Sequence, residues 1–363
     1  MDVTERDLPG KAGAVKEGYL RYSRRKMLFL VASAVLLFFL SVYAIGLGAS
    51  DLSYWEIIEY LFCPDDSWNS VVVWDLRFRM IVACILAGSA LGIAGSVMQS
   101  ILRNPLASPF TLGLSNASAF GASLAILFME GGAIVGSTSA YANVTNPILV
   151  TVFAFLFAML ATGIMLALVK LTECTPETIV LAGMAISSIF SAGLAFLQYI
   201  ANDVALSAMV FWQFGTVSKI SWDQMWIVGS VLLLVSIYFL YKRWDYNAME
   251  SGEDVARGLG INIRATRFIG LTLSAILTAT VVSFMGVIGF IGLVGPHIVK
   301  RIVGNDNRYV LIGSMLIGSV VLLVSYIVGS YAFRTVIPVG IITSAIGGPL
   351  FIAILLKSRR KRR

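Results

Sequence analysis

The uncharged stretch at residues 268–299, FIGLTLSAILTATVVSFMGVIGFIGLVGPHIV, sets how this chain folds. Its 32 residues contain no Asp, Glu, Lys or Arg, which is too many for one membrane span of ~20 residues and slightly few for two. Arg264 and Arg267 precede the stretch, and Lys300 and Arg301 follow it. Because basic residues mark the cytoplasmic side of a membrane, both of its ends should lie on that side. The stretch therefore predicts one span that crosses outward and a short helix that returns.

Glycine recurs at every third position of the predicted return, just before Pro296. Small residues let helices approach closely inside a membrane, whereas proline shortens or breaks a helix. We therefore expect helix packing, rather than substrate contact, at Gly286, Gly289 and Gly292. The same reasoning predicts helix packing at Gly88 and Gly92, which lie in an earlier uncharged run.

Outside this stretch, eight more uncharged runs are long enough to span a bilayer. They are residues 27–47, 80–102, 110–129, 147–169, 178–202, 224–241, 309–333 and 335–355. These eight runs and the two helices predicted within 268–299 indicate an all-α, polytopic membrane protein of about ten transmembrane helices. Its predicted parts are an N-terminal tail at 1–26, a transmembrane domain at 27–357 and a basic C-terminal tail at 358–363. This arrangement puts 23 of the 27 Lys and Arg residues on one side, so both termini should be cytoplasmic in a multi-pass protein of the cell membrane.

The composition excludes several classes of protein. The chain is 58% hydrophobic and 13% charged, about half the charge of a soluble domain. Its net charge of +7 comes from short clusters between the spans, which does not suit a nucleic-acid groove. Cys63, Cys84, Cys174 and the single His297 have no metal-ligand spacing. We therefore predict a protein that is not an enzyme, has no metal site and binds no cofactor of its own.

The source of energy is a separate question, because a transporter needs one. The predicted spans hold no buried acid or base for an ion relay, and Gly10-Lys11 lacks the rest of a nucleotide-binding loop. The longest predicted cytoplasmic loop holds the segment 249–267, in which Ser251 is expected to cap a short helix that ends at Gly258 and Gly260. From spacing alone the segment is either a rigid lever for a peripheral subunit or an ordinary solvated loop.

Four stretches resemble one family of transporters. They are GSALGIAG at 88–95, MQSILRNPLASP at 98–109 with LGLSN at 112–116, GFIGLVGPHI at 289–298, and IPVGIIT at 337–343 with IGGP at 346–349. Together with the 249–267 segment, they are similar to the permease subunits of ATP-binding-cassette (ABC) importers for iron-siderophores, haem and vitamin B12, the FecCD type of type II importer. The stretches spread over most of the chain in the family's order.

The resemblance implies the fold of a type II ABC importer permease and a homodimer with the pathway along its two-fold axis. It implies two cytoplasmic ATPase subunits, which bind ATP and Mg²⁺, and an extracytoplasmic binding protein. The residues that it places on the ATPase are Gly252, Glu253, Ala256, Leu259 and Gly260. Those that it places at the binding protein are Arg77, Arg79 and Arg334. Those that it places along the pathway or its gate are Thr175, Ser187, Ser188, Ser191 and Gln198.

Two departures from the family pattern concern the binding-protein side. The common R-L-P-R motif is replaced by R-F-R-M at 77–80, and Val336 stands where a Glu often precedes L-P-V-G. The sequence does not identify the substrate within the siderophore, haem and corrinoid group. A competing class, an ion-coupled secondary transporter or channel, needs no ATPase. The 249–267 segment and the lack of buried acids separate the two classes.

Overall fold

The computed structural model describes the chain except for residues 1–7, 49, 51, 130–145, 172–175 and 361–363. Its elements are α1 (Leu8–Gly46), α2 (Tyr54–Phe62), α3 (Trp68–Val71), a π-helix η2 (Val72–Phe78), α4 (Arg79–Ile101), α5 (Leu114–Phe128), α6 (Pro147–Leu171), α7 (Pro176–Ile200), α8 (Asp203–Gln213), a 3₁₀ turn η3 (Val217–Lys219), α9 (Trp222–Tyr241), α10 (Arg243–Ser251), α11 (Glu253–Gly258), α12 (Ile263–Met285), α13 (Ile291–Val303), α14 (Asn307–Tyr331) and α15 (Val339–Arg360). The described residues form no β-strand, so the all-α prediction is confirmed.

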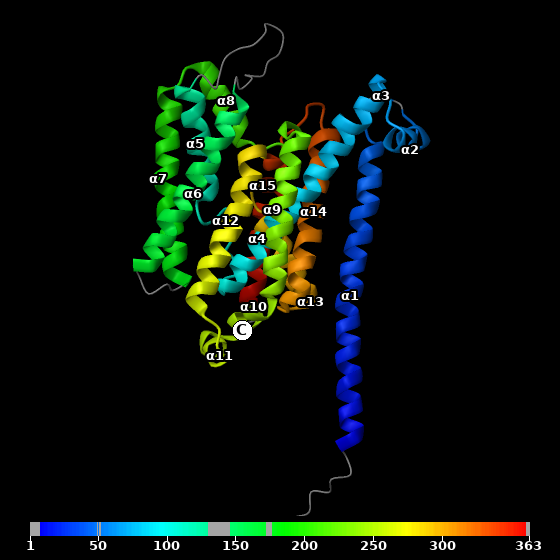
Figure 1. Cartoon of the computed structure of the whole chain (residues 1–363), viewed down its shortest axis with the longest axis vertical. Coiled ribbons are helices and arrows are strands. Elements are labelled where there is room, and N and C mark those ends of the chain that lie inside the picture. The colour runs from blue at the N-terminus through cyan, green and yellow to red at the C-terminus, as the bar shows by residue number, and fades with distance from the viewer. Residues whose placement is uncertain (1–7, 49, 51, 130–145, 172–175, 361–363) are drawn as a thin grey trace, which may run out of the picture.

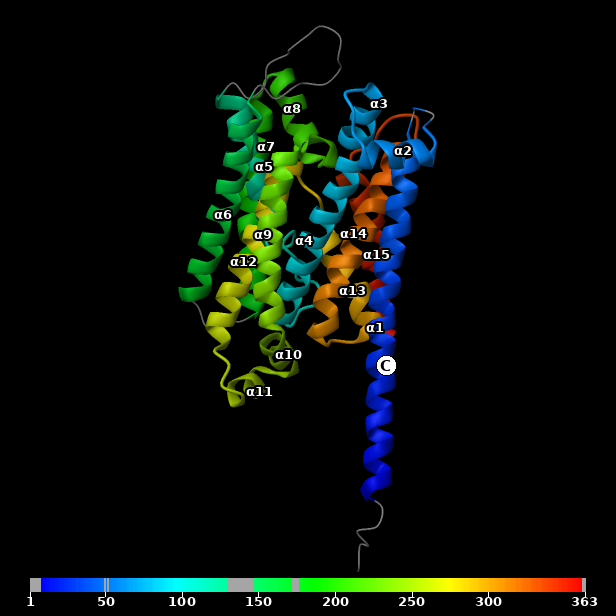
Figure 2. The ribbon, with the colours of Figure 1, turned by 45° about the vertical axis from the view of Figure 1, so that its right-hand side comes forward.

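The helices form an elongated bundle with two distinct ends (Figure 1). One end carries α2, α3 and α8 and is called here the α8 end. The opposite end carries α10, α11 and the C-terminus and is called the α11 end. The start of α1 also lies beyond the α11 end, so the two ends of the described chain are on the same side of the bundle (Figure 2).

Seven helical segments of the described chain are long and apolar enough to cross a membrane. Three more helices complete the bundle but are shorter. These are α5 with 15 residues, α13 with 13 residues, and the apolar part of α15 at Val339–Ala353. The predicted out-and-return stretch is one full span, α12, followed by the short α13. The return is short because Gly286 and Phe290 take positive φ angles, 78° and 65°, which separates the two helices.

The first helix runs without a break from the predicted tail into the predicted span. α1 is one continuous helix of 39 residues, about 58 Å long at 1.5 Å per residue. This is well over the ~30 Å of a bilayer core. The helix runs far beyond the α11 end (Figures 1 and 2) and is not interrupted at residue 26. Its apolar part, Tyr22–Gly46, is the candidate span, and the boundary between tail and span at residue 26 stays a prediction.

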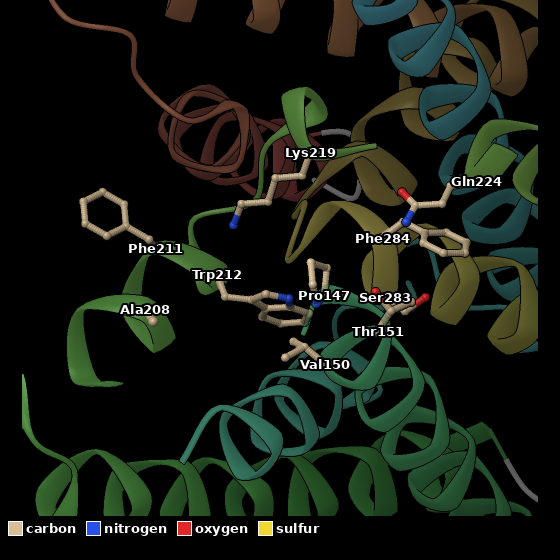
Figure 3. A pocket seen from close by; sticks show the side chains of 10 residues that line it. All are labelled: Pro147, Val150, Thr151, Ala208, Phe211, Trp212, Lys219, Gln224, Ser283 and Phe284. Carbon is tan, nitrogen blue, oxygen red and sulfur yellow. The ribbon is translucent and has the colours of Figure 1, made fainter. Parts of the chain in front are cut away.

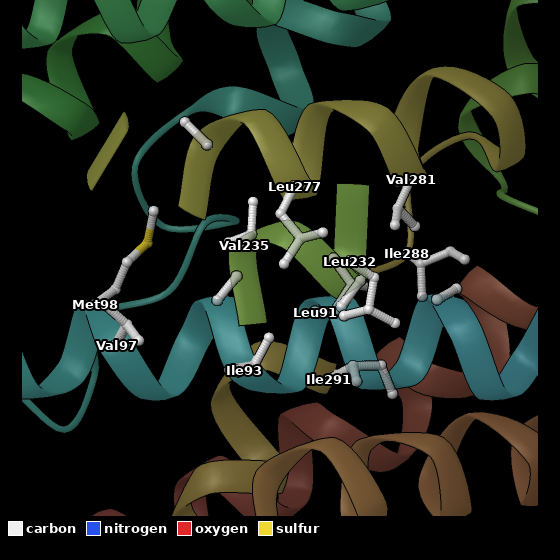
Figure 4. Close-up of a cluster of buried hydrophobic side chains, with 14 of the residues drawn as sticks. Leu91, Ile93, Val97, Met98, Leu232, Val235, Leu277, Val281, Ile288 and Ile291 are labelled. Atoms are coloured by element: carbon white, nitrogen blue, oxygen red, sulfur yellow. The ribbon is translucent and has the colours of Figure 1, made fainter. Parts of the chain in front are cut away.

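α4 forms the centre of the bundle. It packs against α9, α12, α13 and α14, and its side chains are buried along almost the whole helix. Figure 4 shows the apolar cluster on one side of α4, where Leu91 and Val97 meet side chains from α9 and α12, among them Leu232 and Leu277. α1 lies outside this centre against α14, and α5 to α8 form a separate group on the opposite side (Figure 1).

Close contacts between backbones explain several of the glycines. A Cβ atom on Gly88 or Gly92 of α4 would overlap the backbone of α14, and one on Gly292 of α13 would lie 2.9 Å from the Leu91 carbonyl oxygen. At these three glycines the backbones of two helices therefore approach too closely for a side chain. Gly286 serves mainly as the left-handed end of α12, close to the Trp212 carbonyl of α8. At Gly289 an added Cβ would make only ordinary van der Waals contacts with Phe110 and Ser344, so its packing role stays a prediction.

Candidate functional site

The segment between α9 and α12 forms two short helices at the α11 end. α10 and α11 are joined at Gly252, whose φ of 140° suits glycine and few other residues. The expected short helix is therefore present, although it begins differently. Ser251 does not cap it, because the Ser251 hydroxyl donates to the Asn247 carbonyl oxygen of α10 instead.

The end of α11 fixes which of its side chains face outward. Gly260 has a φ of 77°, its N–H donates to the Arg257 carbonyl oxygen, and the Ile261 N–H donates to that of Ala256. This is a Schellman arrangement, in which a left-handed glycine stops the helix. Leu259 is left 68% exposed at the tip, with Val255 beside it at 49%. Two exposed apolar side chains on a short projecting helix form a small contact surface.

Two of the residues expected to touch an ATPase face inward. Ala256 is completely buried, so its predicted contact with a partner was wrong. The Glu253 carboxylate pairs with Arg267 of α12 and with Arg257 of α11. The hydrogen bond from Arg267 lowers the pKa of the Glu253 carboxyl, which keeps this pair charged. Glu253 thus anchors α11 to α12, and its side chain stays 29% exposed.

Arg267 connects this anchor to the centre of the bundle. Arg267 is only 3% exposed, and its Nε donates a hydrogen bond of 3.0 Å to the Ile101 carbonyl oxygen at the end of α4. The last carbonyls of a helix lack partners within that helix, so a guanidinium there satisfies one of them. One arginine therefore links α4, α11 and α12.

A basic cavity of about 410 Å³ lies between α11 and the start of α12. Glu253, Ile261, Asn262 and Ile263 line it together with three arginines, Arg257, Arg264 and Arg267. Sequence reasoning did not single out Val255, Arg257 or Arg264. The helical phase contained the signal, since Val255 and Leu259 are four residues apart and share a face that Ala256 does not.

The arginines expected to meet a binding protein differ strongly in exposure. Arg77 is only 4% exposed and donates to the Ile45 carbonyl oxygen at 3.0 Å and to that of Ser50 at 2.9 Å. The expectation that Arg77 is a docking contact is therefore wrong for this structure, because its guanidinium is used inside the chain. Arg79 is half-buried, and Arg334 is exposed in the connection from α14 to α15 at the α8 end.

The predicted pathway residues lie mainly on α7. The Asn116 amide of α5 donates to the Ser187 hydroxyl at 2.7 Å, and the Ser188 hydroxyl donates to the Met184 carbonyl within α7. Ser191 is exposed and Gln198 is half-buried on the same helix, whereas Thr175 lies outside the described residues. The exposed side of α7 is otherwise apolar, with Ile189 at 68% and Phe196 at 62%.

A second cavity lies at the α8 end, among α6, α8, α9 and α12 (Figure 3). Its volume is about 240 Å³. Trp212, Phe284 and Val150 supply apolar walls, and Lys219 contributes the one cationic side chain of the lining. The volume is below the roughly 300–1,000 Å³ of small-molecule sites, so this cavity alone cannot enclose a bulky substrate.

Comparison with known proteins gives consistent matches over nearly the whole chain. A model of the FecCD transport family matches residues 35–357. An ABC transporter permease protein of Methanocaldococcus jannaschii is 41% identical, covering 96% of this chain and 99% of that protein. An Fe(3+)-citrate import system permease protein of Bacillus subtilis is 32% identical, and the match covers 94% of this chain and 98% of that protein. A solved inward-facing structure of a metal-chelate type ABC transporter superposes with a TM-score of 0.77 at 28% identity. The superposition covers 90% of this chain and 98% of that one.

Proposed function

Because the chain belongs to the FecCD transport family, we propose that it is the membrane-spanning subunit of an ATP-driven importer for an iron-siderophore-type chelate, or for haem or cobalamin. The chain is an ABC importer permease and an integral membrane protein. The similarity to an Fe(3+)-citrate permease and to a metal-chelate type transporter supports a chelate as substrate. The chain thus provides the passage, and other chains bind and hydrolyse ATP with Mg²⁺.

The observation that carries this proposal is the projecting helix α11. It stands at the α11 end with Val255 and Leu259 exposed, and Glu253 and Arg267 anchor it to the bundle. A solvated loop would not need an ion pair to a buried arginine. We assign the exposed face of α11 to a cytoplasmic ATPase, with one ATPase for each permease copy. The basic cavity beside α11 suits acidic side chains of that partner.

Two copies of the chain are proposed to share one pathway. α7 presents an exposed face that combines apolar side chains with Ser191, and the 240 Å³ cavity is too small to be the pathway. A second copy packed around this face would complete a wider channel on a two-fold axis. ATP-driven closure of the ATPases would then switch the channel between its outward and inward openings.

The orientation follows from charge. We place the α11 end and both termini in the cytoplasm, because the basic clusters gather there. The α8 end then faces an extracytoplasmic binding protein. Arg334 is exposed there and can pair with a carboxylate on that partner, and Arg79 is the second candidate.

Reconstitution tests the proposed function. The permease is placed in liposomes with its ATPase and binding protein, and uptake of ferric citrate, haemin and cyanocobalamin is measured with and without ATP. Uptake of one of these compounds only in the presence of ATP is the expected result. Uptake driven by a proton or sodium gradient without ATP would overturn the proposal and favour an ion-coupled carrier.

A further inference from the structure

A second group of polar side chains connects α10 to the bundle, apart from the Glu253–Arg267 pair. Its centre is Glu250, near the end of α10. Its Oε1 accepts a hydrogen bond from Lys300 Nζ of α13 at 2.6 Å and one from the Ser100 hydroxyl of α4 at 2.9 Å. The Glu250 and Lys300 side chains are only 10% and 14% exposed, and Ser100 is fully buried.

The start of α14 joins the same group. The Asn307 Oδ1 lies 3.1 Å from the Ser100 hydroxyl, and the Asn307 backbone N–H donates to the Asn247 Oδ1 of α10 at 2.7 Å. Asn247 and Glu250 are three residues apart, so they lie on one face of α10. This face of a nine-residue helix is therefore held by the end of α4, by α13 and by the start of α14.

The energetics of the group point to positioning. A buried ion pair contributes little net stability compared with apolar residues of the same size, yet loss of one partner is strongly destabilising because the other charge stays buried. Such a pair fixes geometry more than it adds stability. The group also holds two buried atoms without a hydrogen-bond partner, Glu250 Oε2 and Asn307 Nδ2. Neither of these atoms is held in its position by a hydrogen bond.

We propose that the Glu250–Lys300 pair, with Ser100 and Asn307, is the joint that transmits a displacement of α11 to α13 and α14. The inference rests on the proposed function, because it assigns the displacement to an ATPase. α10 is rigid over its nine residues, so movement of α11 shifts Glu250. Lys300 then carries α13 with it, and Asn307 carries α14. Both helices pack directly on α4, so the shift reaches the centre of the bundle. Glu250 and Lys300 are thus positioning residues, which touch neither nucleotide nor substrate.

The reconstituted importer with its ATPase and binding protein tests the joint. The variants are Glu250→Gln, Lys300→Met and the reversed pair Glu250→Lys with Lys300→Glu. Asp245→Asn is the matched control, because Asp245 pairs at 2.9 Å with Lys242, the residue between α9 and α10, and not with a side chain of α4, α13 or α14 among the described contacts. ATP hydrolysis and uptake of ferric citrate, haemin or cyanocobalamin are measured together, using the compound that the unaltered importer takes up.

The ratio of uptake to hydrolysis is the deciding quantity. We expect each single substitution to lower this ratio about tenfold while hydrolysis continues, and the reversed pair to restore most of it, because the effects of two residues in contact are not additive. A purely structural role would lower both rates equally. An unchanged ratio of uptake to hydrolysis in Glu250→Gln would overturn the proposed joint but leave the proposed function standing. If single variants fail to fold, a reversed pair that folds but keeps a tenfold lower ratio would also overturn it. Absence of ATP-driven uptake by the unaltered importer would overturn the proposed function as well.

Discussion

The Arg77 side chain satisfies the backbone where α1 ends. Its guanidinium donates to the carbonyl oxygens of Ile45 and Ser50 and to the Ser50 hydroxyl. Replacement of Arg77 by Met keeps much of the apolar stem but leaves these oxygens without a donor. Hydrogen bonds from a charged group are worth roughly 1.5–3 kcal/mol each, so we expect Arg77→Met to lower the thermal unfolding midpoint by several degrees in detergent.

The control for this change is Arg334→Met at the exposed arginine. It removes the same charge but no internal hydrogen bond that the structure shows, and its midpoint should match that of the unaltered protein. Equal midpoints for both variants would contradict the internal role of Arg77.

The sequence places Arg77 at the correct end of the protein but cannot show which way its side chain points. The reason is the π-helix Val72–Phe78, in which the backbone bonds from i to i+5. Each π turn rotates the following side chains away from the positions that a 3.6-residue period predicts. The Arg77 guanidinium lies toward the bundle and Ile45, although the family resemblance implies an arginine that meets the binding protein.

At the scale of elements, the contact between α4 and α14 depends on the absence of side chains. A Cβ atom on Gly92 would overlap the carbonyl oxygen of Ser314, and a backbone carbonyl cannot move aside as a flexible side chain can. We expect Gly92→Ala to force the two helices apart, at a cost of about 1–3 kcal/mol from overpacking. Lower yield of folded protein and a lower unfolding midpoint are the measurements.

Gly163→Ala provides the matched helix control. Gly163 lies in α6, and an added Cβ there would meet no atom within 4 Å. Because alanine is about 1 kcal/mol better than glycine inside a helix, this variant should be as stable as the original or slightly more stable. A loss of stability equal to that of Gly92→Ala would show that the contact with α14 is not the cause.

Other elements differ in how far the sequence determines them. The out-and-return geometry of α12 and α13 could be predicted, because charges bracket the stretch and glycine is dense where the chain turns. The short α11 could also be predicted from its glycines. Its orientation could not, since the burial of Ala256 and the inward pairing of Glu253 depend on Arg267 from a different helix. Local sequence patterns specify where helices end, whereas contacts between distant residues decide which face of a helix stays exposed.

For the whole molecule, the structure places both termini and α11 on one side, and the proposed orientation makes that side cytoplasmic. A membrane-impermeant maleimide distinguishes the two orientations. Cys63 is exposed at the α8 end and is a native label site. In right-side-out vesicles Cys63 should react, because the proposed orientation puts it outside. Leu259→Cys in a Cys63→Ser background should react only in inside-out vesicles, since Leu259 is 68% exposed on α11.

The Cys63→Ser protein with Leu259 intact gives the background labelling, which removes any contribution from Cys84 and Cys174. The electrostatic reason for the expected result is that Arg257 and Arg264 lie at the α11 end, beside the basic cavity, and resist translocation across the membrane. Labelling of Leu259→Cys in right-side-out vesicles would reverse the orientation. It would also place α11 on the side of the membrane away from a cytoplasmic ATPase. This one measurement therefore tests the premise on which two proposed contacts with the ATPase depend, one through the exposed face of α11 and one through the basic cavity.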